Sequence, residues 1–384
     1  MKKRHIILLV GIYSVAAIIS FLVFSKARGA TTNGISAPVP VDKATGQLSF
    51  DQKQPKTEPC PLNGELYSKQ QKDWWEKHRP LGVMIENHEN ARPQSGLSLT
   101  DVVYEAVAEG GITRFLSIFY CQDAPQVGPI RSARTYFLDF ISEYGDNPLY
   151  VHVGGANRDG QADALAQIEE YGWGAYNDMN QFSIGFPTFW RDYDRLGHST
   201  ATEHTMYSTT TKLWDFAKKS RKLSNVDENS DSWNLKFSPY VFTNGAPLSE
   251  RPASEKVHLE LWEGYKDYAI DWIYDKKENE YKRENGGKPH IDQNNKKQLT
   301  TKNLVVLYMA ETQLNDEEHH LLYKTKGTGK AVVFMNGKEL QGRWKKDGRT
   351  DRLIISDTLG KPVTFIRGRI WFTLLPLDGV ITVK

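Results

Sequence analysis

The stretch 79–134 constrains the fold most, because within it short apolar runs lead into polar clusters. The run Leu81–Ile85 is followed by Glu86-Asn87-His88, and Gly128-Pro129-Ile130 is followed by Arg131-Ser132-Ala133-Arg134. Strands that end at one shared polar cleft produce this arrangement in a sequence. We therefore expect a β-sheet whose strand ends surround a polar site.

The length of the chain favours two globular parts, because 384 residues exceed what one hydrophobic core usually serves. With 25% charged and 39% hydrophobic residues, the composition is that of an ordinary soluble protein. The net charge is +2, which gives no general attraction to nucleic acid. We expect no nucleic-acid partner.

The N-terminus carries an uncharged run over residues 6–25 that is long enough to span a bilayer as a helix, at about 1.5 Å per residue. Basic residues lie at 2–4 before it, and Lys26 and Arg28 follow it. The slight excess of positive charge before the run favours a cytoplasmic N-terminus. We expect a single-pass signal anchor over 1–30 in the cell membrane, with the bulk of the chain extracytoplasmic. A cleaved signal peptide is the alternative.

The rest of the chain is expected to have an α+β fold. Residues 31–78 are rich in small and polar residues and read as a flexible tether. Residues 79–221 mix strands and helices and predict an N-terminal mixed α/β layered domain. Residues 222–235 are polar and read as a linker.

Residues 236–384 predict an all-β C-terminal sandwich or barrel-like domain, because strand-like runs follow one another there. Asn336-Gly337 lies between two such runs and is typical of a type I′ hairpin turn. Asp378-Gly379 suggests a second hairpin near the C-terminus.

Two cysteines, Cys60 and Cys121, are present. An even and small number in an exported domain predicts one disulfide. The alternative is that both are unrelated small hydrophobic residues. Neither lies in a CxxC pair, and the histidines lack the spacing of a zinc motif, so we expect no metal site.

The chain resembles the domain-of-unknown-function family typified by the lipoprotein YerB, in both the N-terminal and the C-terminal domain. The matching segments of the first domain are 80–88, 91–97, 101–105, 109–115 and 127–134. Those of the second domain are 272–275, 329–331 and 342–346. The resemblance implies an envelope protein with two extracytoplasmic domains and supplies no reaction. A hydrophobic span stands here where the lipoprotein members carry a lipid-modified cysteine.

Arginines are the candidate ligand-binding residues, because guanidinium groups bind carboxylate or phosphate oxygens bidentately. The predicted anion-binding residues are Arg92, Arg114, Arg131, Ser132 and Arg134. In the alternative interpretation these arginines form structural salt bridges with Glu86, Asp101, Glu105 and Glu109.

Polar residues near the predicted strand ends are expected to line the same cleft. They are Asn87, His88, Gln94, Ser95, Asp101, Glu105 and Glu109. Asp101 and Glu105 share one face of a predicted strand and could supply an acid, a base or a cation ligand. Capping of a turn and pairing with an arginine is the alternative role for these two acids.

The favoured function is that of a membrane-anchored envelope protein, without catalysis or cofactor, that binds an anionic cell-wall component or an envelope partner. One alternative is a metal-assisted transferase acting on a polyprenyl-pyrophosphate-linked wall polymer. In that case Asp101, Arg114, Arg131 and Arg134 would hold the diphosphate with Mg²⁺. The other alternative is a structural tethering protein.

Overall fold

The computed structural model describes residues 39–43, 46–157 and 160–384. Asp42–Lys384 form one compact unit. The predicted signal anchor at 1–30 and the first part of the predicted tether lie outside the described residues. Within the described ranges, no helix is both long enough and apolar enough to cross a membrane.

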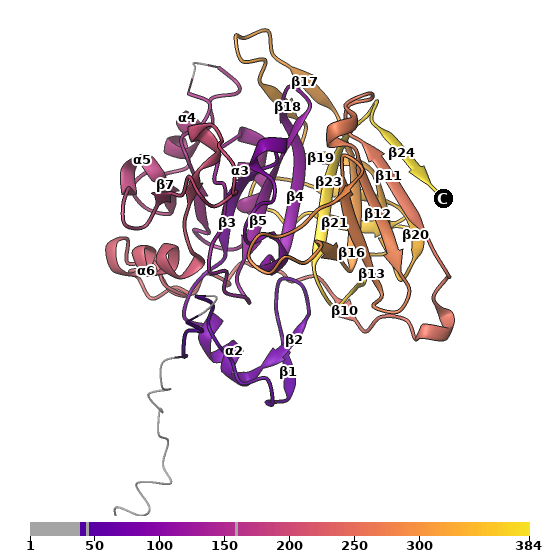
Figure 1. The fold of residues 1–384 in the computed structure, drawn as a ribbon, viewed down its shortest axis with the longest axis horizontal. Helices are drawn as coiled ribbons and strands as arrows, with labels where there is room; N and C mark the ends of the chain where they lie inside the picture. Colours follow the sequence, from indigo (N-terminus) through magenta and orange to yellow (C-terminus); the bar gives the residue numbers. More distant parts are fainter. Residues whose placement is uncertain (1–38, 44–45, 158–159) are drawn as a thin grey trace, which may run out of the picture. The chain divides into compact units, whose positions relative to one another are not determined.

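A ten-stranded sheet runs through the centre of this unit in the order β21-β20-β19-β16-β23-β4-β5-β3-β6-β7 (Figure 1). Five strands come from the first half of the chain: β3 (Leu81–Glu86), β4 (Val102–Glu109), β5 (Ile112–Phe119), β6 (Leu149–His152) and β7 (Asp178–Asn180). Five come from the second half: β16 (Asn303–Met309), β19 (Gly327–Met335), β20 (Lys338–Lys346), β21 (Ile354–Asp357) and β23 (Ile370–Pro376). Strands from both sides of the predicted linker thus share one sheet, while the domain boundaries themselves stay a prediction.

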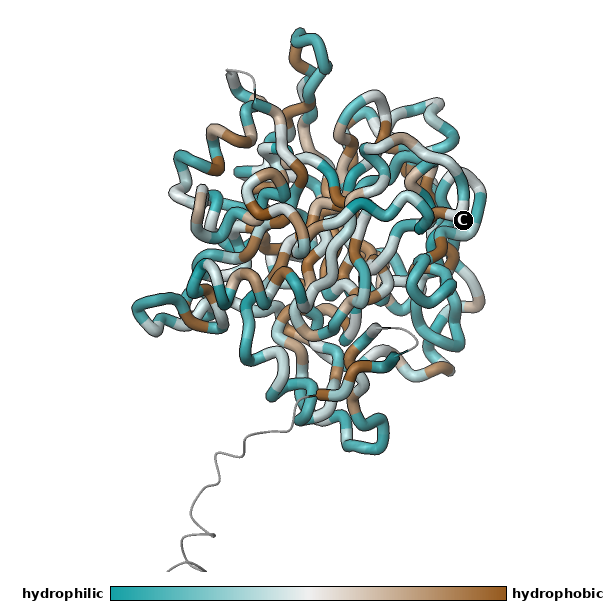
Figure 2. Tube along the Cα trace, turned by 60° about the vertical axis from the view of Figure 1, so that its left-hand side comes forward, coloured by the Kyte–Doolittle hydropathy of each residue, from teal (hydrophilic) through white to brown (hydrophobic). Residues whose placement is uncertain are grey.

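The two halves join where β4 pairs with β23 in parallel, with Tyr104 opposite Phe372. Residues 102–108 of β4 are all buried. Parallel strands that are covered on both faces are nearly continuously apolar. The apolar run at 102–104 therefore predicts a strand. Figure 2 shows the hydrophobic segments concentrated inside the unit and the hydrophilic segments in its outer loops.

A second sheet has the order β14-β13-β12-β11-β24. Its strands are β11 (Lys256–Glu260), β12 (Ile270–Asp275), β13 (Glu280–Asn285), β14 (Lys288–Pro289) and β24 (Val380–Val383), and β15 (Thr300–Thr301) also pairs with β13. Burial alternates along β11, β12 and β13, as expected when one face is packed and the other is solvated. The packed face meets the long sheet through Trp272, whose ring centre lies 5.2 Å from that of Trp371.

Helices cover the other face of the long sheet. The α-helices are α2 (Lys69–Trp75), α3 (Thr135–Ile141), α4 (Ala164–Glu170), α5 (Gln181–Ile184) and α6 (Thr210–Ser220). Phe140 of α3 stacks on Tyr104 with 4.7 Å between ring centres. A Cβ on Gly82 would lie 2.5 Å from Cδ1 of Ile141, so glycine in β3 allows this close approach of helix and sheet.

Shorter elements complete the described chain. Four two-stranded pairs are β1 (Lys56–Pro59) with β2 (Leu66–Ser68), β8 (Trp190–Arg191) with β9 (Met206–Tyr207), β10 (Phe242–Thr243) with β22 (Phe365–Ile366), and β17 (Glu311–Gln313) with β18 (Leu321–Tyr323). The 3-10 turns are η1 (Glu89–Ala91), η2 (Leu97–Leu99), η3 (Thr202–His204), η4 (Leu248–Glu250) and η5 (Lys266–Tyr268). The described chain is thus largely β with few helices, which agrees in part with the predicted α+β fold. The layered α/β arrangement of the N-terminal domain stays a prediction.

One predicted hairpin is confirmed and one is wrong. Asn336 and Gly337 have φ of 57° and 66° and join β19 to β20, as a type I′ turn requires. Asp378-Gly379 joins β23 to β24, but β23 lies in the long sheet and β24 pairs with β11. Local turn chemistry marks a reversal of the chain without specifying which strand the returning segment will pair with.

The predicted disulfide is confirmed, since Cys60 and Cys121 are bonded. It links the segment after β1 to the segment after β5. Both cysteines are buried.

Candidate functional site

Charged side chains gather where parallel strands of the long sheet end. β3, β4 and β6 run in the same direction, because β5 is antiparallel to both β3 and β4 while β6 is parallel to β3. Glu86, Glu109 and His152 are the last residues of β3, β4 and β6. Arg114 lies opposite Glu86 in β5. Charged and polar side chains therefore meet at this edge of the long sheet.

Three predicted arginines at this edge are paired with carboxylates. Glu109 accepts from Nη2 of Arg114 at 3.0 Å and also binds Arg134. Nε of Arg131 lies 3.2 Å from Oε1 of Glu86. Burial lowers the pKa of all three arginines below the ordinary value, although a guanidinium stays cationic at neutral pH. The structural-pairing alternative describes these contacts.

The neighbours of the three arginines are also engaged. Ser132 offers its backbone oxygen to Nη1 of Arg114 at 3.1 Å. Glu86 additionally binds Nδ1 of His204 at 2.8 Å, and the ring of His88 stacks on His204 at 4.8 Å. Ser95 accepts a hydrogen bond from Nε of Arg195 at 3.1 Å. His88 and Ser95 thus take packing and hydrogen-bonding positions.

Asp101 and Glu105 do not join the arginines of the edge. Asp101 precedes β4 at the opposite end of the strand and accepts from the backbone N–H groups of Tyr120 and Cys121 at 2.7 and 2.9 Å. Glu105 is completely buried and binds Nη2 of Arg283 at 2.8 Å. Asp101 thus caps a turn and Glu105 pairs with an arginine, which is the alternative role given above for these two acids.

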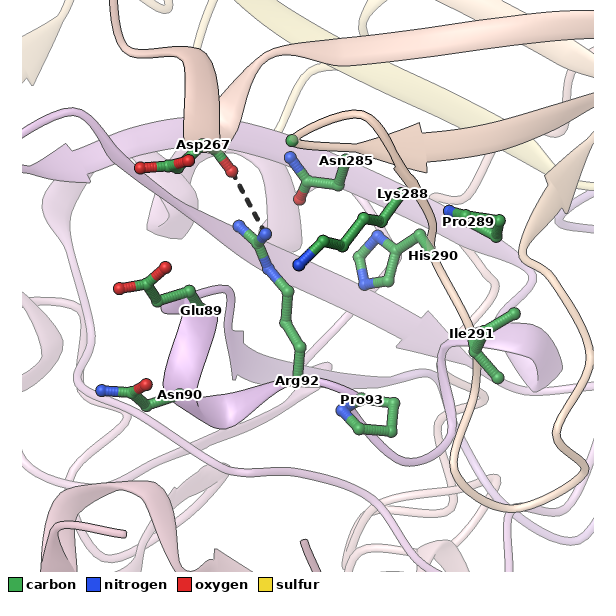
Figure 3. A pocket seen from close by; sticks show the side chains of 11 residues that line it. Glu89, Asn90, Arg92, Pro93, Asp267, Asn285, Lys288, Pro289, His290 and Ile291 are labelled. Carbon is green, nitrogen blue, oxygen red and sulfur yellow. Dashed lines mark hydrogen bonds between the residues drawn. The ribbon is translucent and has the colours of Figure 1, made fainter. Parts of the chain in front are cut away.

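An open cleft of about 430 Å³ lies beside Arg92, between the segment 89–93 and the second sheet (Figure 3). Its lining residues are Glu89, Asn90, Arg92, Pro93, Asp267, Asn285, Gly286, Lys288, Pro289, His290 and Ile291. Arg92 is the predicted anion-binding residue that lines it. Arg114, Arg131, Ser132 and Arg134 are not among its lining residues.

Hydrogen bonds to Asn87, which is a predicted cleft residue, and to Asp267 fix the position of Arg92. Its Nε and Nη2 donate to the side-chain oxygen and the backbone oxygen of Asn87 at 3.1 and 3.0 Å, and Nη1 donates to the backbone oxygen of Asp267 at 3.2 Å. Gln94 also donates to the Asn87 side chain, at 2.9 Å. Burial lowers the pKa of Arg92 to about 10, so the guanidinium is still charged at neutral pH. Asn87 and Gln94 are therefore supporting residues of the cleft.

Lys288 is the second cation of the cleft and was missed from the sequence. It follows the tight turn at Gly286 and Gly287, whose φ angles are 58° and 70°. Figure 3 shows its side chain reaching toward Arg92. Among the described residues, its ammonium group has no hydrogen-bond or ion-pair partner. The signal that could have found it is Asn285-Gly286-Gly287, a hairpin turn that ends β13.

His290 closes the back of the cleft. Its Nδ1 accepts from Nε of Arg283 at 3.0 Å, and Nε2 lies 2.6 Å from Oε1 of Gln94. Burial, together with Arg283 and Arg92, lowers its pKa well below the ordinary value. His290 is therefore a neutral donor to Gln94 and links β13 and β14 to the first half of the chain.

Two groups of metal-ligating residue types occur in the described part of the chain. Cys60, Asp101 and Cys121 form one, but both cysteine sulfurs are used by the disulfide. Asp316, Glu318 and His320 form the other, in which Asp316 binds Nδ1 of His320 at 2.8 Å. This second group could accept a divalent cation by its donor types. It does not line the cleft at Arg92.

Comparison with known proteins matches both halves of the chain. The family described as "Protein of unknown function (DUF3048) N-terminal domain" matches residues 63–224, and its C-terminal domain matches 259–372. "Putative lipoprotein YerB" of Bacillus subtilis (strain 168) is 30% identical over 304 residues, which are 78% of this chain and 82% of that protein. The crystal structure of the Bacillus subtilis YerB protein has a TM-score of 0.68 and 27% identity, and covers 85% of this chain and 100% of that chain.

Proposed function

We propose that this chain, which belongs to the DUF3048 family of proteins of unknown function, binds an anionic cell-wall ligand in the cleft at Arg92. The protein acts outside the cytoplasm, as part of the cell envelope. It needs no cofactor for this role, and binding rather than bond making is its activity.

The location rests on two independent observations. The relative from Bacillus subtilis is named a lipoprotein, and a lipoprotein is attached to a membrane from outside the cytoplasm. In this chain the uncharged run at 6–25, with basic residues at 2–4, is long enough in sequence for a single-pass anchor, which would replace the lipid. The folded unit then faces the wall, where phosphate and carboxylate groups are abundant ligands.

The observation that carries the binding proposal is that Arg92 and Lys288 line one open cleft. Both side chains keep N–H groups that have no hydrogen-bond partner among the described residues. A guanidinium has five N–H bonds, and Arg92 uses three of them in its contacts with Asn87 and Asp267. The remaining N–H groups and the unpaired ammonium of Lys288 can bind one carboxylate or phosphate together. Asn87 and Gln94 fix the guanidinium in place, which reduces the cost of ordering it when ligand binds.

A transferase that holds diphosphate through Asp101 and the edge arginines is not favoured, because these residues are far apart. β4 has eight residues and separates Asp101 from Glu109, the partner of Arg114 and Arg134. At about 3.3 Å per residue, the eight steps along the chain from Asp101 to Glu109 span roughly 26 Å. One diphosphate cannot reach both.

The test is calorimetric titration of the full chain in a mild detergent with two anionic probes, N-acetyl-alanyl-alanine and glycerol 3-phosphate. We expect the wild type to bind at least one probe. Arg92→Gln and Lys288→Gln should each weaken that binding by at least about tenfold, since each removes a charge-assisted contact.

Matched control variants are available for both residues. Arg251 also donates to backbone carbonyls, but those of Ala246 and Lys276, and Lys338 is an exposed lysine outside the cleft. Arg251→Gln and Lys338→Gln should bind as the wild type does. If the wild type binds neither probe, or if Lys288→Gln matches the wild type, a purely structural tethering role is the better explanation.

A further inference from the structure

The cleft at Arg92 carries both signs of charge. Glu89 and Asp267 line it together with Arg92 and Lys288, and the carboxylates of both acids are solvent-exposed. Figure 3 shows the two carboxylates on one side of the Arg92 side chain and Lys288 on the other. An acidic half and a basic half therefore face one space.

The backbone oxygens of both acids, and not their carboxylates, make the hydrogen bonds to Arg92 in the described structure. Asp267 contributes its backbone oxygen to Arg92, and Glu89 contributes its backbone oxygen to the N–H of the same residue. In the described ranges of the chain, the side-chain oxygens of both acids have no hydrogen-bond or ion-pair partner. They are free to receive a donor from a ligand.

The balance of charge decides between ligand classes. Two cations and two carboxylates line the cleft, so a ligand with several negative charges would meet repulsion from Glu89 and Asp267. A purely cationic ligand would be repelled by Arg92 and Lys288 for the same reason. A ligand with one carboxylate and one ammonium group satisfies both halves.

The remaining lining suits a short peptide. Pro93, Pro289 and Ile291 give apolar contact, while the exposed Asn90 offers an amide group. The volume of about 430 Å³ lies within the range of about 300–1,000 Å³ that small-ligand pockets occupy. Apolar walls with a few polar groups at fixed positions are typical of such pockets.

We infer that the carboxylate or phosphate group bound in this cleft belongs to a zwitterionic ligand, namely a short peptide that presents a free amino group as well as a free carboxylate. This inference rests on the proposed function, because it specifies the ligand of the same site. Arg92 and Lys288 bind the carboxylate of the peptide, and Glu89 with Asp267 binds its ammonium group.

The experiment compares three dipeptide probes on the full chain in detergent by calorimetric titration. Alanyl-alanine has both termini free, N-acetyl-alanyl-alanine has only the carboxylate, and alanyl-alanine amide has only the amine. We expect alanyl-alanine to bind at least about fivefold more tightly than either capped probe. In the double variant Glu89→Gln, Asp267→Asn this preference over the N-acetylated probe should disappear.

The double variant should still bind N-acetyl-alanyl-alanine at least as tightly as the wild type, because repulsion between carboxylates is removed. Both substitutions are on exposed side chains without partners in the described structure, so an unchanged thermal midpoint is expected. The control is Glu170→Gln, Asp378→Asn, which changes two exposed acids outside the cleft and should keep the preference.

Three outcomes overturn the inference, and they differ in whether the proposed function falls with it. Equal affinity of the wild type for alanyl-alanine and its N-acetylated form shows an anion site without an ammonium site, and the proposed function stands. A preference that persists in the double variant shows that Glu89 and Asp267 do not bind the ammonium group, and the proposed function again stands. If neither N-acetyl-alanyl-alanine nor alanyl-alanine binds the wild type and glycerol 3-phosphate also fails, the proposed function falls together with the inference.

Discussion

Arg283 and Glu105 form a completely buried ion pair, with Nη2 of the arginine 2.8 Å from Oε1 of the glutamate. The pair connects β13 of the second sheet to β4 of the long sheet. Trp371 donates to the other carboxylate oxygen at 2.9 Å, and the guanidinium lies over the Trp371 ring at 4.9 Å. The cleft at Arg92 is built on this connection, because His290 binds Arg283 on one side and Gln94 on the other.

Removing one partner of this pair should destabilise the protein strongly. Arg283→Met leaves the Glu105 carboxylate buried without its cation, and we expect the free energy of unfolding to fall by about 3–5 kcal/mol. The double variant Arg283→Met, Glu105→Leu removes both charges and should recover part of that loss. Urea unfolding followed by fluorescence measures both values. A double variant less stable than the single variant would contradict this account.

The disulfide should contribute about 4 kcal/mol, since Cys60 and Cys121 are 61 residues apart and the bond restricts the unfolded chain. We expect the double variant Cys60→Ala, Cys121→Ala to show that loss in urea unfolding. A reducing agent should lower the urea midpoint of the wild type and leave the double variant unchanged. Equal midpoints for wild type and double variant would show that the bond does not stabilise the fold.

Sequence reasoning found the features that depend on neighbouring residues. The apolar runs of β3 and β4 predicted strands, because buried parallel strands are apolar on both faces. The polar cluster after β3 predicted Arg92 and its supports Asn87 and Gln94. These residues lie within a few positions of one another in the chain, so local pattern was sufficient to group them.

Sequence reasoning missed the features that depend on distant pairing. β13 has the polar sequence Glu280-Tyr281-Lys282-Arg283-Glu284-Asn285, and nothing in it shows that Arg283 will be buried against Glu105. Lys346 follows another lysine in the sequence, yet it is fully buried, with its ammonium group 3.2 Å from the carboxylate of Glu143. A charged residue is buried only when its partner is in place, and the partner lies far away in the sequence.

Asp101 should make stability depend on pH. Burial raises its pKa to about 7, although the N–H groups of Tyr120 and Cys121 favour the ionised form. In the unfolded chain the pKa of an aspartate is about 3.9. Between about pH 4 and about pH 7 the folded state therefore holds a proton that the unfolded state has lost. Stability contributed by this group is therefore present below about pH 4 and is lost as pH rises toward about 7.

The measurement for Asp101 compares wild type with Asp101→Asn by urea unfolding between pH 4 and pH 8. The difference in unfolding free energy, wild type minus variant, should fall by up to about 4 kcal/mol as pH rises to about 7, and then become constant. Other titrating groups contribute equally to both proteins. A difference that rises with pH would show that the hydrogen bonds to Asp101 outweigh its burial.

We expect the carboxylate of Glu109 to prevent Arg114 and Arg134 from binding anions. Its carboxylate serves both Arg114 and Arg134, and its side chain is 27% exposed. Glu109→Gln removes the carboxylate that forms salt bridges with both arginines, and we expect a loss of about 1–2 kcal/mol in unfolding free energy.

Phosphate should restore part of the stability lost in Glu109→Gln, because an anion that binds only the folded state stabilises it. Thermal unfolding with and without 50 mM phosphate measures the gain, with Glu170→Gln as the control for the loss of one surface charge. We expect a larger shift of the midpoint in Glu109→Gln than in wild type or control. An equal shift in all three would show that phosphate acts elsewhere on the protein and that the loss of Glu109 opens no anion site at this edge.

The turn that carries Lys288 provides a test with a matched control one residue away. Gly286 has a φ of +58°, and a Cβ there would lie 2.7 Å from the backbone oxygen of Asp267, which accepts from Arg92. Gly287 has a φ of +70°, but a Cβ there would meet nothing within 4 Å. Gly287→Ala should therefore cost only backbone strain of about 1 kcal/mol, whereas Gly286→Ala should also displace the Asp267 carbonyl.

Displacement of that carbonyl removes one of the three bonds that hold Arg92, so Gly286→Ala should weaken the binding of N-acetyl-alanyl-alanine by roughly tenfold. Gly287→Ala should bind this probe within about twofold of the wild type, because Lys288 and Arg92 keep their positions. Calorimetric titration measures both affinities, and urea unfolding shows that both variants are folded. If Gly286→Ala binds like Gly287→Ala, the position of Arg92 does not depend on the Asp267 carbonyl, and Asn87 together with the Tyr268 ring fixes the guanidinium.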